Sequence, residues 1–230
     1  MLTSNSSEHG AIIVAGGSGK RFGTDLPKQF LELGGQPVLM HTIQRFYQTI
    51  QDIQIVVVLP DEHIDTWNLL CKKYNFNILH EVVSGGESRF QSVKNGLATL
   101  PQCETIAVQD GVRPLTPHNL IKNCFEEAKR HGSCVPVIPV TDSLRTGSFH
   151  QNTPVSRESL FRVQTPQVFR NAWIMQAYEL AFDPSFTDDA SVVEKAGHQI
   201  FLTQGAEENI KITQPKDLEL AHFYLENNEP

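Results

Sequence analysis

The fold is decided by a stretch near the N-terminus that reads Ala11-Ile12-Ile13-Val14-Ala15-Gly16-Gly17-Ser18-Gly19-Lys20-Arg21. The apolar run 11–14 predicts a buried strand. The glycines that follow predict a loop whose backbone N–H groups surround an anion, because glycine has no Cβ to obstruct them. Lys20 and Arg21, with Lys28 a little further on, add three positive charges. The stretch therefore predicts a strand that leads into a polyphosphate-binding loop.

This loop departs from both common phosphate-binding motifs. A P-loop requires G-x-x-x-x-G-K-[ST], but Arg21 follows Gly19-Lys20 here. The dinucleotide fingerprint requires G-x-G-x-x-G, but Phe22 stands where the third glycine belongs. Taken by itself, the loop is equally well interpreted as a surface turn with solvated cations.

Composition narrows the classes of function. The 230 residues are 40% hydrophobic and 20% charged, which is typical of a globular chain. The formal net charge of -7 argues against nonspecific nucleic-acid binding, so any anionic substrate must be attracted by a local cluster of cations. No apolar run reaches the roughly 18 residues that span a bilayer, and we expect no membrane association.

The N-terminal segment and the cysteines suggest where the protein resides. Residues 1–9 are polar and lack the apolar core of a secretory signal, so we expect a disordered tail ahead of a single domain at 10–230. The cysteines form no C-x-x-C pair and suit neither a zinc site nor a disulfide framework. We therefore expect free thiols and a cytoplasmic location. The four cysteines are Cys71, Cys103, Cys124 and Cys134.

Strand and helix signals alternate over the first 138 residues. The β-branched run 53–59 is nearly continuous, which is typical of a strand covered on both faces. The alternation predicts an α/β fold with a mainly parallel twisted sheet and helices on both faces. Predicted strands are 11–14, 53–59, 77–83, 105–108 and 133–138, and predicted helices are 37–48, 61–73, 87–100 and 117–130.

The alternation breaks at 139–168. This segment has short alternating stretches, a turn at Gly147 and too few apolar residues for a core of its own. It predicts a protruding hairpin-like arm, and because such an arm needs a partner to cover it, we expect a homodimer. Beyond the arm we expect helices at 171–182, 188–195 and 215–226 and strand-like segments at 199–203 and 209–213.

Four polar signals fall near predicted strand ends, where open α/β sheets bind ligands. They are the glycine-rich loop, 85–89, 110–114 and Lys211. Arg21 and Lys28 suit a triphosphate, whereas a second set of cations suits another phosphate. That second set is Arg113, Arg157 and Lys211. Two cationic sets are what a transfer between two phosphorylated molecules needs, and the acceptor phosphate can itself attack.

Two residues of the 110–114 segment carry alternative interpretations. Asp110 is a candidate Mg²⁺ ligand or a partner for substrate hydroxyls, but it equally suits a cap on the turn that ends at Pro114. Arg113 binds phosphate or simply pairs with Asp110. Arg157, in the arm, would by itself be interpreted as a solvated charge.

Two further segments resemble helix starts. Ser88 and Ser92 lie with Arg89 where a helix begins, which suits nucleotide contacts but also ordinary residues of a first turn. Asp188 and Asp189 are most simply a helix start.

Six motifs together resemble those of the 2-C-methyl-D-erythritol 4-phosphate cytidylyltransferase family. They are A-G-G-S-G-K-R-F…P-K-Q-F, G-G-E-S-R-F-Q-S-V, Q-D-G-V-R-P, R-V-Q-T-P-Q-V-F, T-D-D-A-S and E-N-I-K-I-T, and they span about residues 10–226 in order. The resemblance implies a Rossmann-like nucleotidyltransferase fold, a homodimer joined by the arm, and Mg²⁺ as cofactor. It also implies transfer of a cytidylyl group from CTP to methylerythritol phosphate in non-mevalonate isoprenoid biosynthesis.

The resemblance also implies roles for individual residues. Arg21 and Lys28 would stabilise the pentacoordinate α-phosphate, and Arg157 and Lys211 complete the catalytic set. Residues of the nucleotide loop would be Ala15, Gly16 and Gly17, and those at cytosine or ribose would be Gly86, Arg89 and Ser92. The sugar phosphate would be bound by Asp110, Arg113, Thr165, Thr187 and Lys211. From the arm, Ser143 and Arg157 would reach the partner's site.

The motifs depart from the family pattern in four places, none of which removes a charge that the mechanism needs. The departures are Gly17-Ser18, Gly111-Val112 after Asp110, Ser143 in place of threonine, and Glu208 in place of aspartate. Ribitol-5-phosphate cytidylyltransferase shares these motifs and differs in its acceptor pocket. A catalytically silent nucleotide-binding protein is a second alternative, and a dinucleotide-dependent oxidoreductase, whose fingerprint is broken here, is a third.

Overall fold

A computed structural model describes residues 7–17 and 26–227. Arg21 and the rest of 18–25 lie outside the described residues, as do 1–6 of the predicted tail. His9, which we expected in the tail, begins β1 (His9–Val14). The apolar run at 11–14 therefore forms the strand that its composition predicts.

The main sheet is mostly parallel on one side of β1 and mixed on the other. Its order is β10-β7-β11-β6-β1-β4-β5, and β12 pairs with β7. The strands β4 (Gln54–Leu59), β5 (Glu81–Ser84) and β6 (Thr105–Asp110) run parallel to β1. β11 (Gln167–Arg170) lies antiparallel between β6 and β7 (Ser133–Pro139). β12 (Leu202–Gln204) and β10 (Phe161–Val163) extend this edge.

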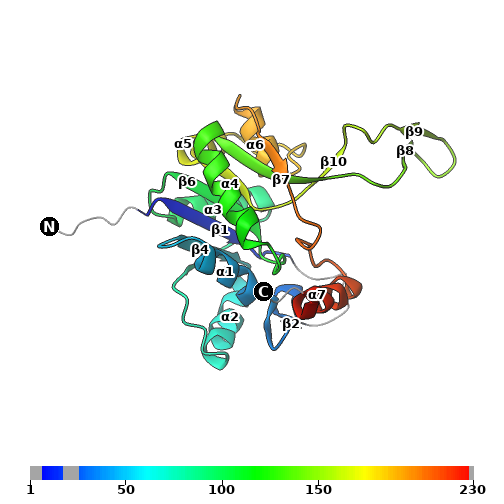
Figure 1. Cartoon of the computed structure of the whole chain (residues 1–230). Coiled ribbons are helices and arrows are strands. Elements are labelled where there is room, and N and C mark those ends of the chain that lie inside the picture. The colour runs from blue at the N-terminus through cyan, green and yellow to red at the C-terminus, as the bar shows by residue number, and fades with distance from the viewer. Residues whose placement is uncertain (1–6, 18–25, 228–230) are drawn as a thin grey trace.

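Helices cover both faces of the sheet, as predicted (Figure 1). Alternate residues of β1 point to opposite faces, because successive side chains of a strand alternate. Ile13 packs with α1 (Val38–Thr49), α2 (Asp61–Lys73) and α4 (His118–His131). Ile12 packs with α3 (Arg89–Thr99), α5 (Asn171–Ala177) and α6 (Asp189–Lys195).

The C-terminal helix α7 (Pro215–Asn227) packs outside these layers. Ala221 of α7 shares a small apolar cluster with Leu33 of the hairpin β2 (Glu32–Leu33) and β3 (Gln36–Pro37). Ile212 is fully buried in the same cluster. The predicted strand at 209–213 is therefore wrong: its apolar alternation comes from packing against α7, and no strand pairs with it within the described chain.

Two other predicted elements are shorter than expected. The predicted strand 77–83 is regular only at 81–84, because residues before it pack on a helix instead. There the Trp67 indole N–H donates to His80 Nε2 at 3.0 Å, and the Phe76 ring packs against the same indole. The helix expected at 171–182 ends at Ala177.

The predicted arm protrudes, but only part of 139–168 belongs to it (Figure 1). Its tip is the antiparallel hairpin of β8 (Leu144–Gly147) and β9 (Asn152–Val155). The backbone bond from Val140 N–H to the Leu160 oxygen, at 3.1 Å, closes its base. Residues 161–163 and 167–168 belong to the main sheet, because their backbone groups pair with β7 and β6.

Gly132, at the C-terminus of α4, tests the packing of one face of the sheet. Its φ is +91°, and a Cβ here would lie 2.1 Å from the Trp173 ring. We expect Gly132→Ala to lower the free energy of unfolding by about 3 kcal/mol, since a strained left-handed residue and an overpacked contact add. Gly197→Ala is the matched control, because its φ is +94° but nothing lies within 4 Å. Equal losses in urea unfolding would contradict the role of the ring contact.

Candidate active site

The glycine-rich loop is anchored where β1 ends. The Ala15 N–H donates to the Val58 oxygen at 2.9 Å, and the Ala15 oxygen accepts from Gln29 Nε2 at 2.9 Å. Lys28 begins the short helix η1 (Lys28–Phe30), and a Cβ on Gly17 would lie 3.2 Å from Lys28 Cε and 3.6 Å from Nζ. The Lys28 side chain thus lies against the loop, as a triphosphate site requires.

The second cationic set gathers at the end of β6. Asp110 Oδ2 lies 3.1 Å from Arg113 Nε and 3.1 Å from Lys211 Nζ. The Asp110 N–H donates to Thr165 Oγ1 at 3.1 Å. The alternative in which Arg113 pairs with Asp110 is therefore what the structure shows, with Lys211 as a second partner. The turn itself is closed by the backbone, from the Arg113 N–H to the Asp110 oxygen.

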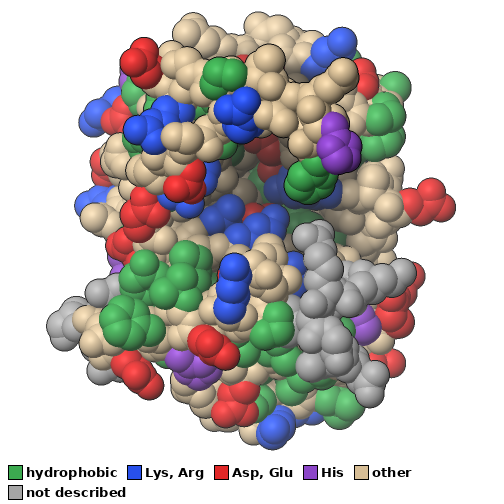
Figure 2. Space-filling view, turned by 90° about the vertical axis from the view of Figure 1, so that its right-hand side faces the viewer, with side chains coloured by type: hydrophobic (Ala, Val, Ile, Leu, Met, Phe, Trp, Pro, Cys, Tyr) green, Lys and Arg blue, Asp and Glu red, His purple; other side chains and the backbone are tan. Residues whose placement is uncertain are grey.

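The two halves of the site lie on neighbouring strands. Val14 pairs in register with Asp110, so the loop after β1 and the cluster after β6 begin side by side. Gly111 fits closely here, because a Cβ on it would lie 2.8 Å from the Ala15 Cβ. This contact explains why glycine follows Asp110 in this chain. Figure 2 shows the result: a hollow at the middle of this face in which Lys and Arg side chains gather.

The charges around Asp110 make one prediction. Burial disfavours its charged form, but Lys211, Arg113 and then Arg89 outweigh burial and lower its pKa from 3.8 to about 2. A lowered pKa contributes stability above the unfolded value of 3.8, and the contribution is lost as the pH falls through 2. We expect the carboxylate to stabilise the fold by about 2 kcal/mol at pH 7.

The matching variant is Asp110→Asn, with Asp65→Asn on the exposed side of α2 as control. The free energy of unfolding, measured from pH 7 to pH 2, should fall less steeply between pH 4 and pH 2 in Asp110→Asn than in the unaltered protein. If the free energy of unfolding fell equally steeply between pH 4 and pH 2 in Asp110→Asn and in the unaltered protein, the lowered pKa would be contradicted.

Asn209 connects the segments around this cluster, and the sequence did not single it out. It is fully buried, and its backbone oxygen accepts from Arg113 Nη1 at 2.6 Å. Its Oδ1 accepts from Thr116 Oγ1 at 2.9 Å, and its Nδ2 donates to the Thr165 oxygen at 2.9 Å. One residue thus fixes the segments that hold Arg113, Thr165 and Lys211.

Arg89 is held by a buried partner. Its Nη1 and Nη2 donate to the two carboxylate oxygens of Asp189 at 2.7 and 2.6 Å, and Asp189 also accepts from the Tyr178 hydroxyl at 2.6 Å. Asp189 is fully buried. Burial opposes the charge on Arg89, but Asp189 outweighs it and raises the Arg89 pKa. The interpretation of Asp188 as a helix start is confirmed, since it caps α6, whereas the role of Asp189 was missed.

The first turn of α3 fixes the second glycine loop. Ser88 caps the helix by accepting from the Gln91 N–H at 3.1 Å, so it is an ordinary first-turn residue. Ser92 Oγ accepts from the Gly86 N–H at 3.0 Å and donates to the Ser88 oxygen at 2.9 Å. A Cβ on Gly86 would lie 2.2 Å from Gln91 Cγ, so glycine is required there.

The structure does not bring all predicted residues together. Gly16 and Thr187 are exposed, and Thr187 directly precedes the α6 cap. Ser143 and Arg157 are exposed in the arm, where Arg157 donates to the Thr141 oxygen. In the described parts of the chain, no hydrogen bond or ion pair joins either arm residue to the Asp110 cluster.

Residues 7–17 and 26–227 hold neither a cluster of three metal-binding side chains nor a membrane span. No three His, Cys, Asp or Glu side chains there are placed to hold a metal ion. No helix in this part is long and apolar enough to cross a bilayer. The four cysteines are free thiols, as expected.

The mainly parallel sheet, with a glycine loop and two cationic groups at its strand ends, defines a nucleotidyltransferase. A family profile described as "2-C-methyl-D-erythritol 4-phosphate cytidylyltransferase" matches residues 10–227 of this chain. The chain belongs to that family. It transfers a cytidylyl group from CTP to 2-C-methyl-D-erythritol 4-phosphate, giving 4-CDP-2-C-methyl-D-erythritol and pyrophosphate in non-mevalonate isoprenoid biosynthesis.

Individual relatives agree with this assignment. The cytidylyltransferase of the same description from Bacteroides thetaiotaomicron is 48% identical over 214 residues, which cover 93% of this chain and 98% of the relative. The Porphyromonas gingivalis protein of that description is 48% identical, covering 94% and 96%. The crystal structure of 4-diphosphocytidyl-2C-methyl-D-erythritolsynthase from Anaerococcus prevotii superposes with a TM-score of 0.80 at 27% identity, covering 96% and 99%. These matches give no support to the three alternatives, which were a ribitol-5-phosphate cytidylyltransferase, a catalytically silent nucleotide-binding protein and a dinucleotide-dependent oxidoreductase.

Proposed function

We propose that the cluster after β6 binds methylerythritol phosphate and that the loop after β1 binds the triphosphate of CTP. The observation that carries this assignment is the pairing of Asp110 with both Arg113 and Lys211, directly beside the loop that holds Lys28. The cluster carries one net positive charge, which suits a phosphorylated polyol that presents hydroxyls as well as phosphate.

The chemistry then needs no protein nucleophile. A phosphate oxygen of the acceptor attacks the α-phosphorus of CTP, the bond from that phosphorus to the β-phosphate oxygen breaks, and pyrophosphate leaves. Negative charge builds on the α-phosphate, where Lys28 and Arg21 stabilise it. Positioning two anions in line accounts for most of the remaining rate enhancement.

Lys211 and Arg113 have different roles in binding the acceptor, because their side chains differ in exposure. The Lys211 side chain is 42% exposed, so its ammonium reaches the acceptor while Asp110 orients it. Arg113 is only 8% exposed, and its Nε and Nη1 are already bonded, so it supports the site mainly by fixing the turn. The Thr165 hydroxyl lies beside them, bonded to the Asp110 N–H, and Thr187 would supply a second hydroxyl from the segment just before the α6 cap.

The part of the site that would bind the cytidine of CTP is formed by the loop before α3. Asp189 fixes the Arg89 guanidinium and Ser92 fixes Gly86, so both present a preformed wall to cytosine or ribose. Ala15, Gly16 and Gly17 complete the nucleotide loop with backbone N–H groups. A preformed wall lowers the entropy that binding would otherwise cost.

Mg²⁺ fits this site as a companion of CTP rather than as a resident ion. Asp110 Oδ2 is already bonded to Arg113 and Lys211, so this carboxylate is a poor metal ligand. Mg²⁺ prefers phosphate oxygens and water in such sites, and there it supplies charge neutralisation on the triphosphate. Direct ligation by Asp110 therefore fits this geometry poorly.

The arm supports a homodimer that completes each site. Phe149 at its tip is fully exposed, and Phe161 and Val163 at its base are each 46% exposed, which is costly unless a partner covers them. Ser143 and Arg157 would then reach the partner's acceptor site. The free thiols agree with a cytoplasmic location. We also propose that residues 10–230 form one domain.

Mixed dimers test the shared site. Lys28→Ala chains and Arg157→Ala chains are each expected to be nearly inactive, but a heterodimer rebuilds one intact site of two. Pyrophosphate release should therefore recover to about half the unaltered rate per heterodimer when the two variants are mixed and allowed to exchange. Exchange is verified with a mass-tagged chain. Heterodimers without recovered activity would overturn the shared site.

A further inference from the structure

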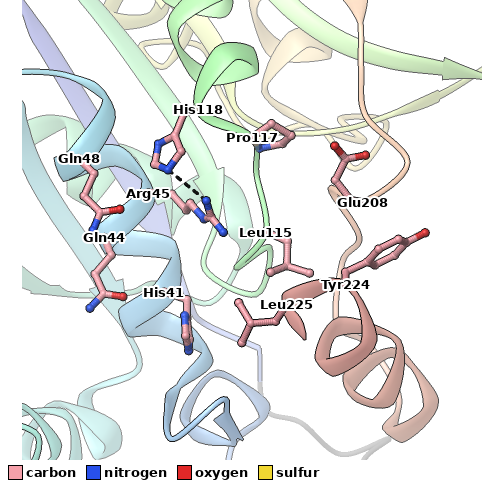
Figure 3. Close-up of a pocket in the computed structure, with 10 residues that line it drawn as sticks. All are labelled: His41, Gln44, Arg45, Gln48, Leu115, Pro117, His118, Glu208, Tyr224 and Leu225. Carbon is pink, nitrogen blue, oxygen red and sulfur yellow. Dashed lines mark hydrogen bonds between the residues drawn. The ribbon is translucent and has the colours of Figure 1, made fainter. Parts of the chain in front are cut away.

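A second cavity lies behind the acceptor site, between α1, α4 and α7 (Figure 3). Its volume is about 440 Å³, within the range of small-molecule sites. The segments that carry Asp110 and Lys211 also contribute to its lining. The lining residues are His41, Gln44, Arg45, Gln48, Leu115, Pro117, His118, Glu208, Tyr224 and Leu225.

Arg45 and His118 form one wall of this cavity (Figure 3). Arg45 Nη1 lies 3.0 Å from His118 Nε2, and Thr49 Oγ1 lies 2.6 Å from His118 Nδ1. A guanidinium only donates, so Nε2 accepts, and the ring proton lies on Nδ1 toward Thr49. Within the described chain, no carboxylate lies within 4 Å of the Arg45 side chain. The guanidinium therefore faces the cavity with its charge uncompensated.

Two histidines that are neutral at pH 7 and the N-terminus of one helix lie near Arg45. Burial lowers the pKa of His118, and Arg45 lowers it further. Burial also lowers the pKa of His41, against the bond to the Leu33 oxygen, and Arg45 and His222 add to the lowering. The N-terminus of α4 opens here too, with Pro117 at the cap and no acidic residue in its first turn. A helix N-terminus carries partial positive charge.

We propose that this cavity binds a small phosphate monoester, with the phosphate between Arg45 and the first turn of α4 and with the neutral His118 ring beside it. The guanidinium and the helix N–H groups approach from different directions, which suits the oxygens of a phosphate. Leu115, Leu225 and the Tyr224 ring provide apolar surface for the carbon part of the ester. Glu208, across the cavity, disfavours a second anionic group and limits the ligand to one phosphate. Such a ligand would contact the back of the wall that forms the acceptor site.

The binding test uses the His118 ring as a reporter, so phosphate bound in the active site does not contribute. Phenyl phosphate is titrated into the protein while the His118 imidazole signals are followed by NMR, and His118→Gln assigns those signals. We expect a saturable shift, with inorganic phosphate binding more weakly and phenol producing no shift. No saturable shift, or equal affinity for phenyl phosphate and inorganic phosphate, would overturn the proposal of an ester site.

Variants locate the charge that binds. Arg45→Gln should weaken phenyl phosphate at least tenfold, whereas Arg45→Lys, which keeps the charge, should bind more tightly than Arg45→Gln. Arg130→Gln is the control, because Arg130 lies at the other end of α4 and pairs with Glu127 at 2.7 Å. The same isotherm in Arg45→Gln and the unaltered protein would refute the site, and this result is independent of the roles assigned to the catalytic residues.

Discussion

Lys28→Ala is expected to lower kcat about 10³-fold while the Kd for CTP changes less than about threefold. The Lys28 ammonium lies against Gly17 of the nucleotide loop, where the charge of the transferred phosphate increases in the transition state. An interaction that strengthens in the transition state lowers the barrier, and three decades of rate correspond to about 4 kcal/mol. CTP in the ground state retains its other contacts.

The measurement separates binding from chemistry. Single-turnover pyrophosphate release gives the rate at saturating CTP, and calorimetry gives the Kd. Lys122→Ala on the exposed face of α4 controls for the loss of one positive charge, because its side chain is 68% exposed. Equal losses of rate and of CTP affinity would show that Lys28 contributes only uniform binding.

Asn209→Ala is expected to raise the KM for methylerythritol phosphate about 30-fold while the KM for CTP stays within about twofold. Removing the side chain takes from Thr116 one of its buried partners and leaves the Thr165 oxygen without its bond from Nδ2, and an unsatisfied buried group costs about 1–3 kcal/mol. The segments that position Arg113 and Lys211 then shift relative to Asp110. Asn209 touches neither substrate in this scheme, so it is a positioning residue.

Two further variants separate positioning from general stability. Asn209→Asp keeps the shape but places an acceptor oxygen against the Thr165 oxygen, so it should raise the same KM. Asn171→Ala removes a comparable bond, from Nδ2 to the Cys103 oxygen at 2.8 Å, near the start of β6 at the opposite end of the strand. Asn171→Ala should lower stability without changing either KM. A rise in both KM values for Asn209→Ala would contradict the selective role.

The local patterns of the sequence predicted most of the fold. The continuous β-branched run of β4 and the alternation of strands with helices require a parallel sheet, and both were confirmed. The pattern failed where apolar alternation had another cause. Ile210 and Ile212 alternate with polar residues as in a strand, yet they pack toward α7 and its neighbours. Periodicity reports which side chains are buried, but it does not identify what buries them.

The candidate site was only half predictable, for a related reason. Glycines and cations that follow a strand are visible locally, so the loop and the Asp110 segment were found. The groups that hold them lie far away in sequence: Asp189 is 100 residues from Arg89, and Asn209 is 96 residues from Arg113. A buried asparagine bonded to backbone oxygens has no sequence signature, and an aspartate beside a helix cap resembles another cap residue.

This separation has a consequence for the order in which function appears during folding. β1, β4, β5 and β6 and the helices between them lie within the first 140 residues. Arg89 and Arg113, however, are held by Asp189 and Asn209, which lie in the last third of the described chain. Closing such long loops is slow relative to forming local contacts. We therefore expect a nascent or partly folded molecule to lack an assembled cleft and to consume no CTP until the segments that carry Asp189 and Asn209 have packed.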